Sequence, residues 1–181
     1  MWTHVIELSS LPDGKLRDSG ERDTNAGVEV TLTAPSAGLT EMAERLMVPS
    51  VESISADFSV YRQVSQRNLI VVEAAFQVNL HLTCGVTLED FSTEISETMT
   101  QDFSTTEIIP QDEGEDVPEY IEGREMDLVD VLAQLIAVNI EPYPRKPDAD
   151  LAAVVSGKVG VNEEEQKENP FAKLADLKGK L

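Results

Sequence analysis

The sequence predicts an α+β fold: an antiparallel β-sheet with packed helices and a flexible C-terminal tail. Three observations support this prediction. Segments with the two-residue period of β-strands follow one another without the regular βαβ alternation of a parallel sheet. A strongly apolar helical stripe comes after these strands. Beyond about residue 148 the periodic pattern fades, as in a linker.

The first predicted elements are a strand and a short helix. Residues 28–34 alternate apolar and polar side chains, with β-branched residues among them, as in a half-buried strand. Apolar residues then recur from Leu39 to Met47 at the spacing of one helical stripe. Ser36 or Thr40 is the expected N-cap of this helix.

Two further strands are expected to form a hairpin. Apolar and polar side chains alternate over residues 51–62. Over residues 70–82 every even position is apolar, which is the clearest periodic signal in the chain. The residues between these two segments are polar and predict a turn, so the two strands should pair with each other.

The segment from Phe91 to Phe103 fits two structures. Its apolar residues recur every four positions, which matches either a helical stripe or alternate inward positions of a strand. Many of the residues between them are serine or threonine, which form helices poorly and favour or tolerate a sheet. We therefore predict a strand.

The end of the folded body is predicted to hold an acidic loop, an edge strand and a helix. Residues 111–116 indicate an acidic turn or loop, and residues 120–126 an edge strand. Asp127 is expected to cap a helix whose wide apolar face runs from Leu128 to Val138 and suits packing against a sheet.

The chain is expected to divide into a body over residues 1–147 and a tail over residues 148–181. The tail begins as an acidic linker, and Asn169 with Pro170 predicts the start of a short amphipathic helix. Because a helix of roughly eight residues is marginal on its own in water, we expect it to order only against its own body or against a partner.

The charge of the chain limits its partners. There are 34 acidic and 14 basic side chains, a formal net charge of −20, and residues 101–150 are the most acidic part. A body this negative repels phosphate, which argues against extensive direct binding of nucleic acid. It attracts basic proteins, such as ribosomal proteins, although surplus carboxylates also serve solubility.

Several classes of protein are disfavoured. No apolar run reaches the length of a membrane span and the N-terminus lacks the layout of a signal peptide, so we expect a cytoplasmic protein without membrane contact. The single cysteine, Cys84, excludes an intrachain disulfide and a zinc site built on paired cysteines. Because the phosphate-loop, metalloprotease and hydrolase motifs are missing, we expect no enzymatic activity and no cofactor.

The segment at residues 81–91, HLTCGVTLEDF, resembles the central motif of the YceD family, the large ribosomal RNA subunit accumulation proteins. Four other segments resemble the family in the same order. They are residues 42–58, EMDL at 125–128, EPYPRKP at 141–147 and NPFAKL at 169–174. The resemblance covers nearly the whole chain. The EPYPRKP and NPFAKL segments resemble the proteobacterial branch of the family.

The family motif is only partly retained. Many family members carry Cys-x-x-Cys here and further cysteines near the end, whereas this chain has Thr87 at the second position and lacks the distal pair. Metal binding is therefore not carried over. Asp90 also replaces the usual proline, while Cys84, Leu88 and Glu89 remain. The resemblance implies a role in the accumulation or processing of large-subunit ribosomal RNA, without a catalytic residue set.

Two hypotheses on function follow. The first is a non-enzymatic assembly factor whose acidic surface binds a basic ribosomal protein or the pre-ribosomal large subunit. The second is an adaptor that binds ribosomal RNA or a ribonuclease through its C-terminal tail, which is the expected route of any direct RNA contact. Acidic side chains would attract the partner, basic ones would face RNA, and apolar tail residues would enter a groove. The candidate residues are Asp112, Glu113, Glu115, Asp116, Glu119, Glu122, Arg145, Lys146, Phe171, Leu174 and Leu177.

Overall fold

The structure is a computed structural model that describes residues 1–16, 22–23, 27–63, 66, 68–110, 114, 117–147 and 149. The chain divides after Lys146, and Met1–Lys146 forms one compact unit that contains every helix and strand described below. The predicted helix of the C-terminal tail lies outside the described residues.

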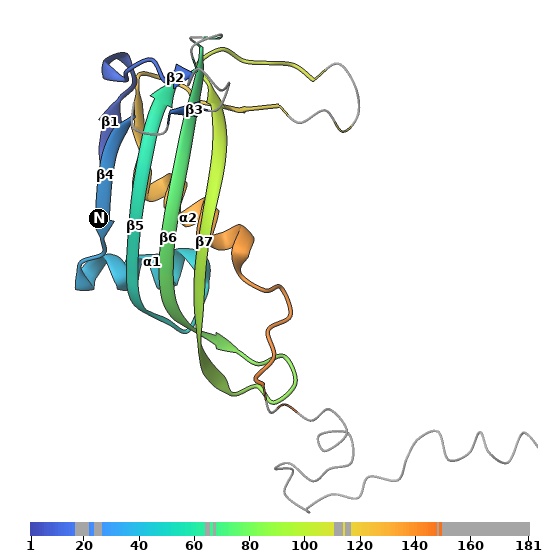
Figure 1. Ribbon diagram of the computed structural model, residues 1–181. Coiled ribbons are helices and arrows are strands. Elements are labelled where there is room, and N and C mark those ends of the chain that lie inside the picture. Colours follow the sequence, from blue (N-terminus) through green and yellow to red (C-terminus); the bar gives the residue numbers. More distant parts are fainter. Residues whose placement is uncertain are drawn as a thin grey trace, which may run out of the picture. The chain divides into compact units, whose positions relative to one another are not determined.

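A five-stranded sheet forms the centre of this unit (Figure 1). Its spatial order is β4 (Val28–Thr33), β5 (Ser50–Arg62), β6 (Leu69–Thr83), β7 (Asp90–Ser104) and β8 (Glu119–Tyr120). The first four strands pair antiparallel, and the short β8 runs parallel to the end of β7. The predicted strands at 28–34, 51–62 and 70–82 are confirmed, and so is the hairpin that joins the last two.

Strand β7 confirms the extended structure predicted for Phe91 to Phe103. It pairs with β6 along its whole length, with Phe103 opposite Ile70 and Phe91 opposite Leu82. The four apolar residues that suggested a helical stripe therefore lie on the same face as the even-numbered residues of β6. Most of the intervening serines and threonines lie on the other face of the strand, as its two-residue period requires, whereas Thr93, opposite Leu80, lies on the core side.

Helix α1 (Ser36–Leu46) includes Ser36 as its first residue, so Ser36 cannot be the N-cap that precedes the helix. Pro35 occupies the N-cap position and makes no side-chain cap bond, so the expected caps Ser36 and Thr40 are wrong. Ser36 is already helical, and a capping residue needs an extended backbone. The helix ends at Met47, which has a left-handed φ of 55° and whose N–H bonds the carbonyls of Ala43 and Glu44.

Helix α2 (Leu128–Asn139) starts as predicted from Asp127. The Asp127 Oδ1 accepts the Val129 N–H at 2.9 Å and also the His4 N–H at 2.9 Å. Both helices lie against one face of the sheet (Figure 1). Their apolar sides and the inward residues of the strands form one core, whose largest fully buried side chains include Phe58, Ile70, Leu80, Leu132 and Ile136.

The predicted edge strand over residues 120–126 is wrong in its bounds. Residues 119–120 form β8, whereas β9 (Glu125–Asp127) pairs antiparallel with β1 (Val5–Glu7) in a separate two-stranded sheet. Gly123 lies between them with a φ of 109°, which breaks the extended backbone. The remaining short elements are η1 (Leu8–Ser10) and the pair β2 (Lys15–Leu16) and β3 (Arg22–Asp23).

Within the described residues, no helix combines the length and the apolar character that a membrane span requires.

Candidate functional site

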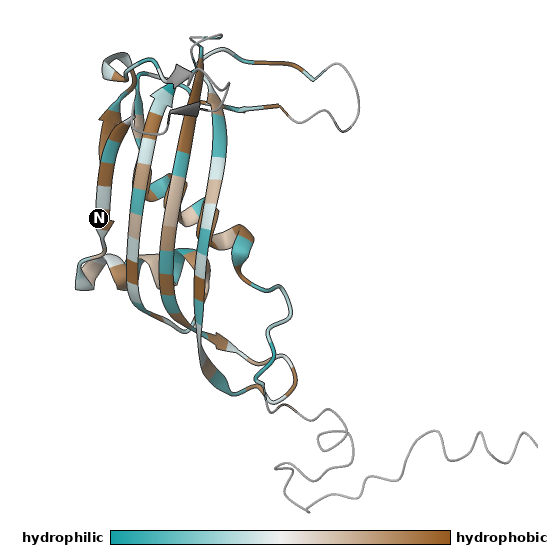
Figure 2. Cartoon of the chain, viewed as in Figure 1, coloured by the Kyte–Doolittle hydropathy of each residue, from teal (hydrophilic) through white to brown (hydrophobic). Residues whose placement is uncertain are grey.

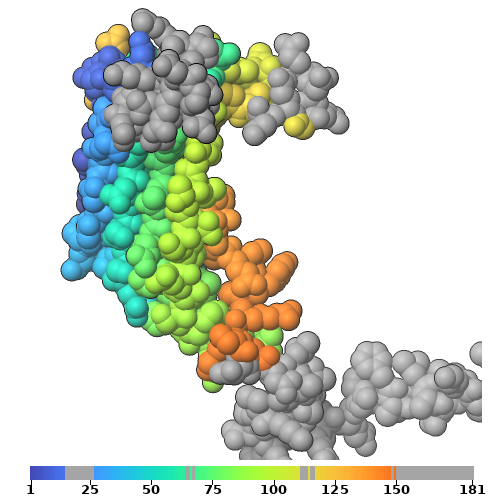
Figure 3. Space-filling model, viewed as in Figure 1, coloured from blue at the N-terminus to red at the C-terminus, as the bar shows by residue number. Residues whose placement is uncertain are grey.

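The face of the five-stranded sheet opposite the helices is mostly polar, and its strands β4 to β7 carry acidic residues there but no lysine or arginine. We call it the open face, and Figure 3 looks onto it. Strand register defines its members, because residues paired across neighbouring strands point to the same side. In β4 to β7 they are Glu29, Thr31, Thr33, Ser50, Ser53, Ser55, Asp57, Ser59, Tyr61, Leu69, Val71, Glu73, Ala75, Gln77, Asn79, His81, Thr83, Asp90, Ser92, Glu94, Ser96, Thr98, Thr100, Asp102 and Ser104. Five of them, Ser59, Tyr61, Leu69, Val71 and Ser104, are buried.

Six of these residues are acidic, and none of the open-face residues of β4 to β7 is lysine or arginine. The alternation of hydrophilic and hydrophobic residues along β5 and β6 is visible in Figure 2. Glu29, Asp57 and Glu94 are exposed, as are most of the serines and threonines around them. The open face therefore offers acceptor oxygens and negative charge to solvent.

The carboxylates of the open face are held by neighbouring hydroxyls. Asp57 Oδ1 accepts the Thr31 hydroxyl at 2.6 Å, and Glu73 Oε1 accepts the Tyr61 hydroxyl at 2.7 Å. Asp102 Oδ1 is buried and accepts no hydrogen bond from the described part of the chain. Since a hydroxyl does not neutralise a carboxylate, the negative charge remains to act on a partner.

The second feature is the turn between β6 and β7, formed by residues 84–89. The Cys84 N–H bonds the Glu89 carbonyl at 2.9 Å and closes the hairpin, while the Leu88 N–H bonds the Cys84 carbonyl at 2.9 Å. The three family-motif residues Cys84, Leu88 and Glu89 thus lie in one six-residue turn. We call it the motif turn.

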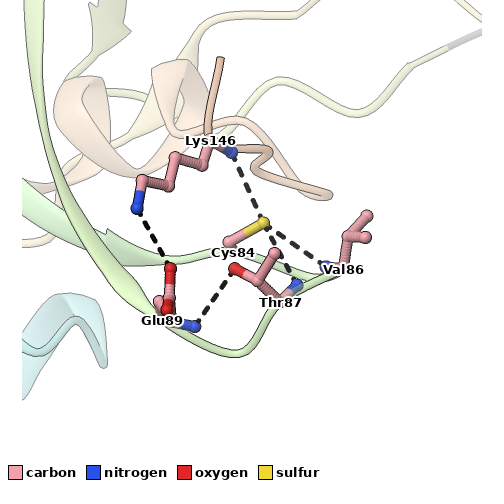
Figure 4. A network of polar contacts seen from close by, with 5 residues as sticks. All are labelled: Cys84, Val86, Thr87, Glu89 and Lys146. Carbon is pink, nitrogen blue, oxygen red and sulfur yellow. Dashed lines mark hydrogen bonds and ion pairs between the residues drawn. The ribbon is translucent and has the colours of Figure 1, made fainter. Parts of the chain in front are cut away.

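Cys84 is fully buried at the base of the motif turn, and its sulfur is an acceptor (Figure 4). The Thr87 hydroxyl and the N–H groups of Lys146, Thr87 and Val86 donate to it, at 3.4 Å from Lys146 and Val86 and 3.5 Å from the Thr87 nitrogen. The Thr87 hydroxyl bond, followed by the Lys146 and Thr87 backbone donors, lowers the pKa of the Cys84 thiol to about 6, although burial opposes this shift.

A second segment braces the motif turn. The Gly85 N–H bonds the Pro144 carbonyl at 2.9 Å, and the Lys146 backbone N–H reaches the Cys84 sulfur. The Lys146 ammonium also lies 3.0 Å from Glu89 Oε2 (Figure 4). Two segments that are far apart in the sequence therefore hold each other in place here, and the Lys146 ammonium is paired with a carboxylate.

Leu88 is strained and exposed within this braced turn. Its φ is 60°, in the left-handed region that glycine and asparagine adopt readily, and 78% of its surface is exposed. For a residue with a bulky side chain this conformation costs roughly 1 kcal/mol. No burial of the Leu88 side chain within the described chain offsets that cost.

The structure brings together only part of the predicted site. Glu119 and Glu122 are both exposed, with Glu119 in β8 and Glu122 just after it. Arg145 is exposed, whereas the Lys146 ammonium forms an ion pair with Glu89. Predicted site residues that lie outside the described residues are Asp112, Glu113, Glu115, Asp116, Phe171, Leu174 and Leu177.

Two features were missed from the sequence. The open face follows from the polar positions that alternate with the apolar ones in β5, β6 and β7, and their shared side could have been inferred by pairing the strands. The left-handed backbone of Leu88 has no signal in its residue type, because that conformation usually selects glycine or asparagine.

A metal centre is not a feature of the described residues: no three histidine, cysteine, aspartate or glutamate side chains there are grouped to hold an ion.

Comparison with known proteins gives one match. No curated protein and no solved structure matches the chain. The family model for the large ribosomal RNA subunit accumulation protein YceD matches residues 72–178, which is more than half of the 181 residues. The matched region includes most of β6, all of β7, the motif turn and α2. The chain therefore belongs to the YceD family.

Proposed function

We propose that the chain acts as a non-enzymatic assembly factor for the large ribosomal subunit and that its open face binds a basic ribosomal protein. Membership of the YceD family implies a role in the accumulation of large-subunit ribosomal RNA. Binding of a ribosomal protein would serve that role by keeping the basic protein available to the maturing particle.

One observation carries this proposal: the open face has six carboxylates in β4 to β7, four of them exposed (Glu29, Asp57, Asp90 and Glu94), and no lysine or arginine. A surface with charge of one sign attracts partners of the opposite sign, which raises the association rate and selects among partners. The overall net charge of −20 acts in the same direction. Ribosomal RNA, a polyanion, is repelled by the same surface.

The proposal is tested by measuring binding of the full chain to individually purified basic proteins of the large subunit. Bare large-subunit ribosomal RNA serves as the competing probe. Binding to at least one basic protein should weaken steeply between about 0.05 and 0.3 M salt, because exposed charges are screened within about 8 Å at physiological ionic strength. Tight, salt-insensitive binding of the protein probe, or binding of bare RNA alone, would contradict the proposal.

Matched variants locate the surface. Neutralising the open face with Glu29→Gln, Asp57→Asn and Glu94→Gln keeps the size of each side chain and should weaken binding about tenfold or more. The control carries the same change of charge at Glu119→Gln, Glu122→Gln and Glu125→Gln, all exposed and outside the open face. A larger loss in the control would place the partner at the acidic segment that includes Glu119 and Glu122.

A further inference from the structure

We infer that Leu88 is an anchor residue, whose side chain enters an apolar pocket of the basic protein partner, with acidic residues beside it facing lysines and arginines at the rim of that pocket. This inference rests on the proposed function, since the partner is the protein that the open face attracts. Charge alone would attract many basic proteins, and an apolar contact through Leu88 would select among them.

The backbone of the motif turn gives the first step. The hydrogen bonds from Cys84 N–H to Glu89 and from Leu88 N–H to Cys84 close the hairpin with Leu88 in the left-handed region, at a φ of 60°. Glycine or asparagine takes this conformation at little cost, and leucine does not. Strain of this kind at an ordered position points to a use for the side chain.

Exposure gives the second step. The Leu88 side chain is 78% exposed, so the core of this chain does not explain why a leucine stands in a turn that favours glycine. Tyr143, which is 79% exposed, directly precedes Pro144, and the Pro144 carbonyl accepts the Gly85 N–H. Two large exposed side chains therefore flank one junction.

Rigidity gives the third step. The turn is held by the donors to the Cys84 sulfur, by the Gly85–Pro144 bond and by the Lys146–Glu89 ion pair (Figure 4). An apolar side chain on a fixed backbone loses little freedom when it binds, which favours a central contact in an interface.

Charge decides the chemistry of the partner. Leu88 is followed by Glu89, which is 61% exposed and paired with Lys146, and by the exposed Asp90. Tyr143 lies between the exposed Glu141 and the exposed Arg145. The three carboxylates outnumber the two cations, so the net charge here repels phosphates, and the aliphatic Leu88 does not stack on bases. A nucleic acid is therefore disfavoured. A protein pocket with a basic rim fits both the apolar side chain and the acids around it.

The test compares Leu88→Gly, Leu88→Asn and Leu88→Met in the full chain. Glycine and asparagine relieve the backbone strain and remove the apolar side chain, whereas methionine keeps an apolar side chain of similar size. Affinity for the basic large-subunit protein that binds best should fall at least about tenfold in the first two variants and stay within about threefold in the third. Melting temperatures should be equal to or above that of the original chain.

Met47→Gly is the matched control. Met47 also has a left-handed φ, of 55°, and a side chain that is 91% exposed, but it ends helix α1 and lies outside the motif turn. Its binding should be unchanged. Equal binding by the original chain and by Leu88→Gly overturns the anchor alone, whereas failure of the original chain to bind any basic protein overturns the proposed function and the anchor together. Equal losses in Met47→Gly and Leu88→Gly also overturn the anchor.

Discussion

At the scale of single residues, Cys84 combines full burial with several hydrogen-bond donors. A buried thiol in apolar surroundings would stay protonated, because burial disfavours the thiolate. Here the Thr87 hydroxyl and the N–H groups of Lys146, Thr87 and Val86 favour the thiolate and lower the pKa to about 6. Thr87 stands where a second cysteine would complete a Cys-x-x-Cys pair, and its hydroxyl binds the sulfur instead.

The lowered pKa predicts a pH-dependent stability. In the unfolded chain the thiol titrates near its ordinary value of 9.0, and in the folded chain near 6. The folded state therefore releases the proton first, so the contribution of Cys84 to stability is complete above about pH 9 and is lost as the pH falls to about 6. Urea unfolding of the original chain and of Cys84→Ser at pH 6, 7.5 and 9 should show a difference that grows with pH.

Thiolate absorbance near 240 nm offers a direct control, because the chain has a single cysteine. The native protein should titrate with a midpoint near pH 6, and the urea-unfolded protein with a midpoint well above it. A native midpoint at or above 8.5 would show that burial outweighs the donors. Burial also predicts slow alkylation of the native thiol even where it is ionised.

At the scale of elements, Asp127 joins two parts of the body. Its Oδ1 accepts from Val129 at the start of α2 and from His4 at the start of β1. Asp127→Ala should lower the free energy of unfolding by about 1–2 kcal/mol, because both backbone donors lose their acceptor. Asp127→Asn keeps an acceptor oxygen and should lose less than half as much in the same urea titration. Equal losses would indicate that charge, and not the acceptor, stabilises the helix start.

The elements show what periodicity predicts and what it does not. The strands β5, β6 and β7 are predictable from the alternation of apolar and polar residues. Because one face of the sheet is buried, this alternation also fixes the face on which each side chain lies. The two ends of α1, at Pro35 and Met47, and the break in the strand expected over residues 120–126, at Gly123, depend on single backbone conformations. Such conformations leave no periodic pattern. The candidate site has the same limits: the acidity of the chain is visible in its composition, whereas the brace between Cys84 and Lys146 depends on tertiary structure.

At the scale of the whole molecule, the sheet separates two kinds of surface. One face carries the core and both helices, and the open face carries the carboxylates of four strands. Because like charges on neighbouring strands repel one another, this arrangement costs stability in the free protein. A cationic partner would remove the repulsion, so binding and stability are coupled through the same charges.

This coupling predicts that salt has opposite effects on stability and on binding. Raising the ionic strength from about 0.01 to about 0.15 M shortens the screening length from about 30 to about 8 Å. The melting temperature of the free full chain should then rise by a few degrees as repulsion weakens, while its affinity for a basic ribosomal protein falls. The variant with Glu29→Gln, Asp57→Asn and Glu94→Gln should melt higher at low salt and respond less to salt in both measurements. A melting temperature that falls with added salt would mean that attractive ion pairs, such as Lys146 with Glu89, outweigh the repulsion between carboxylates.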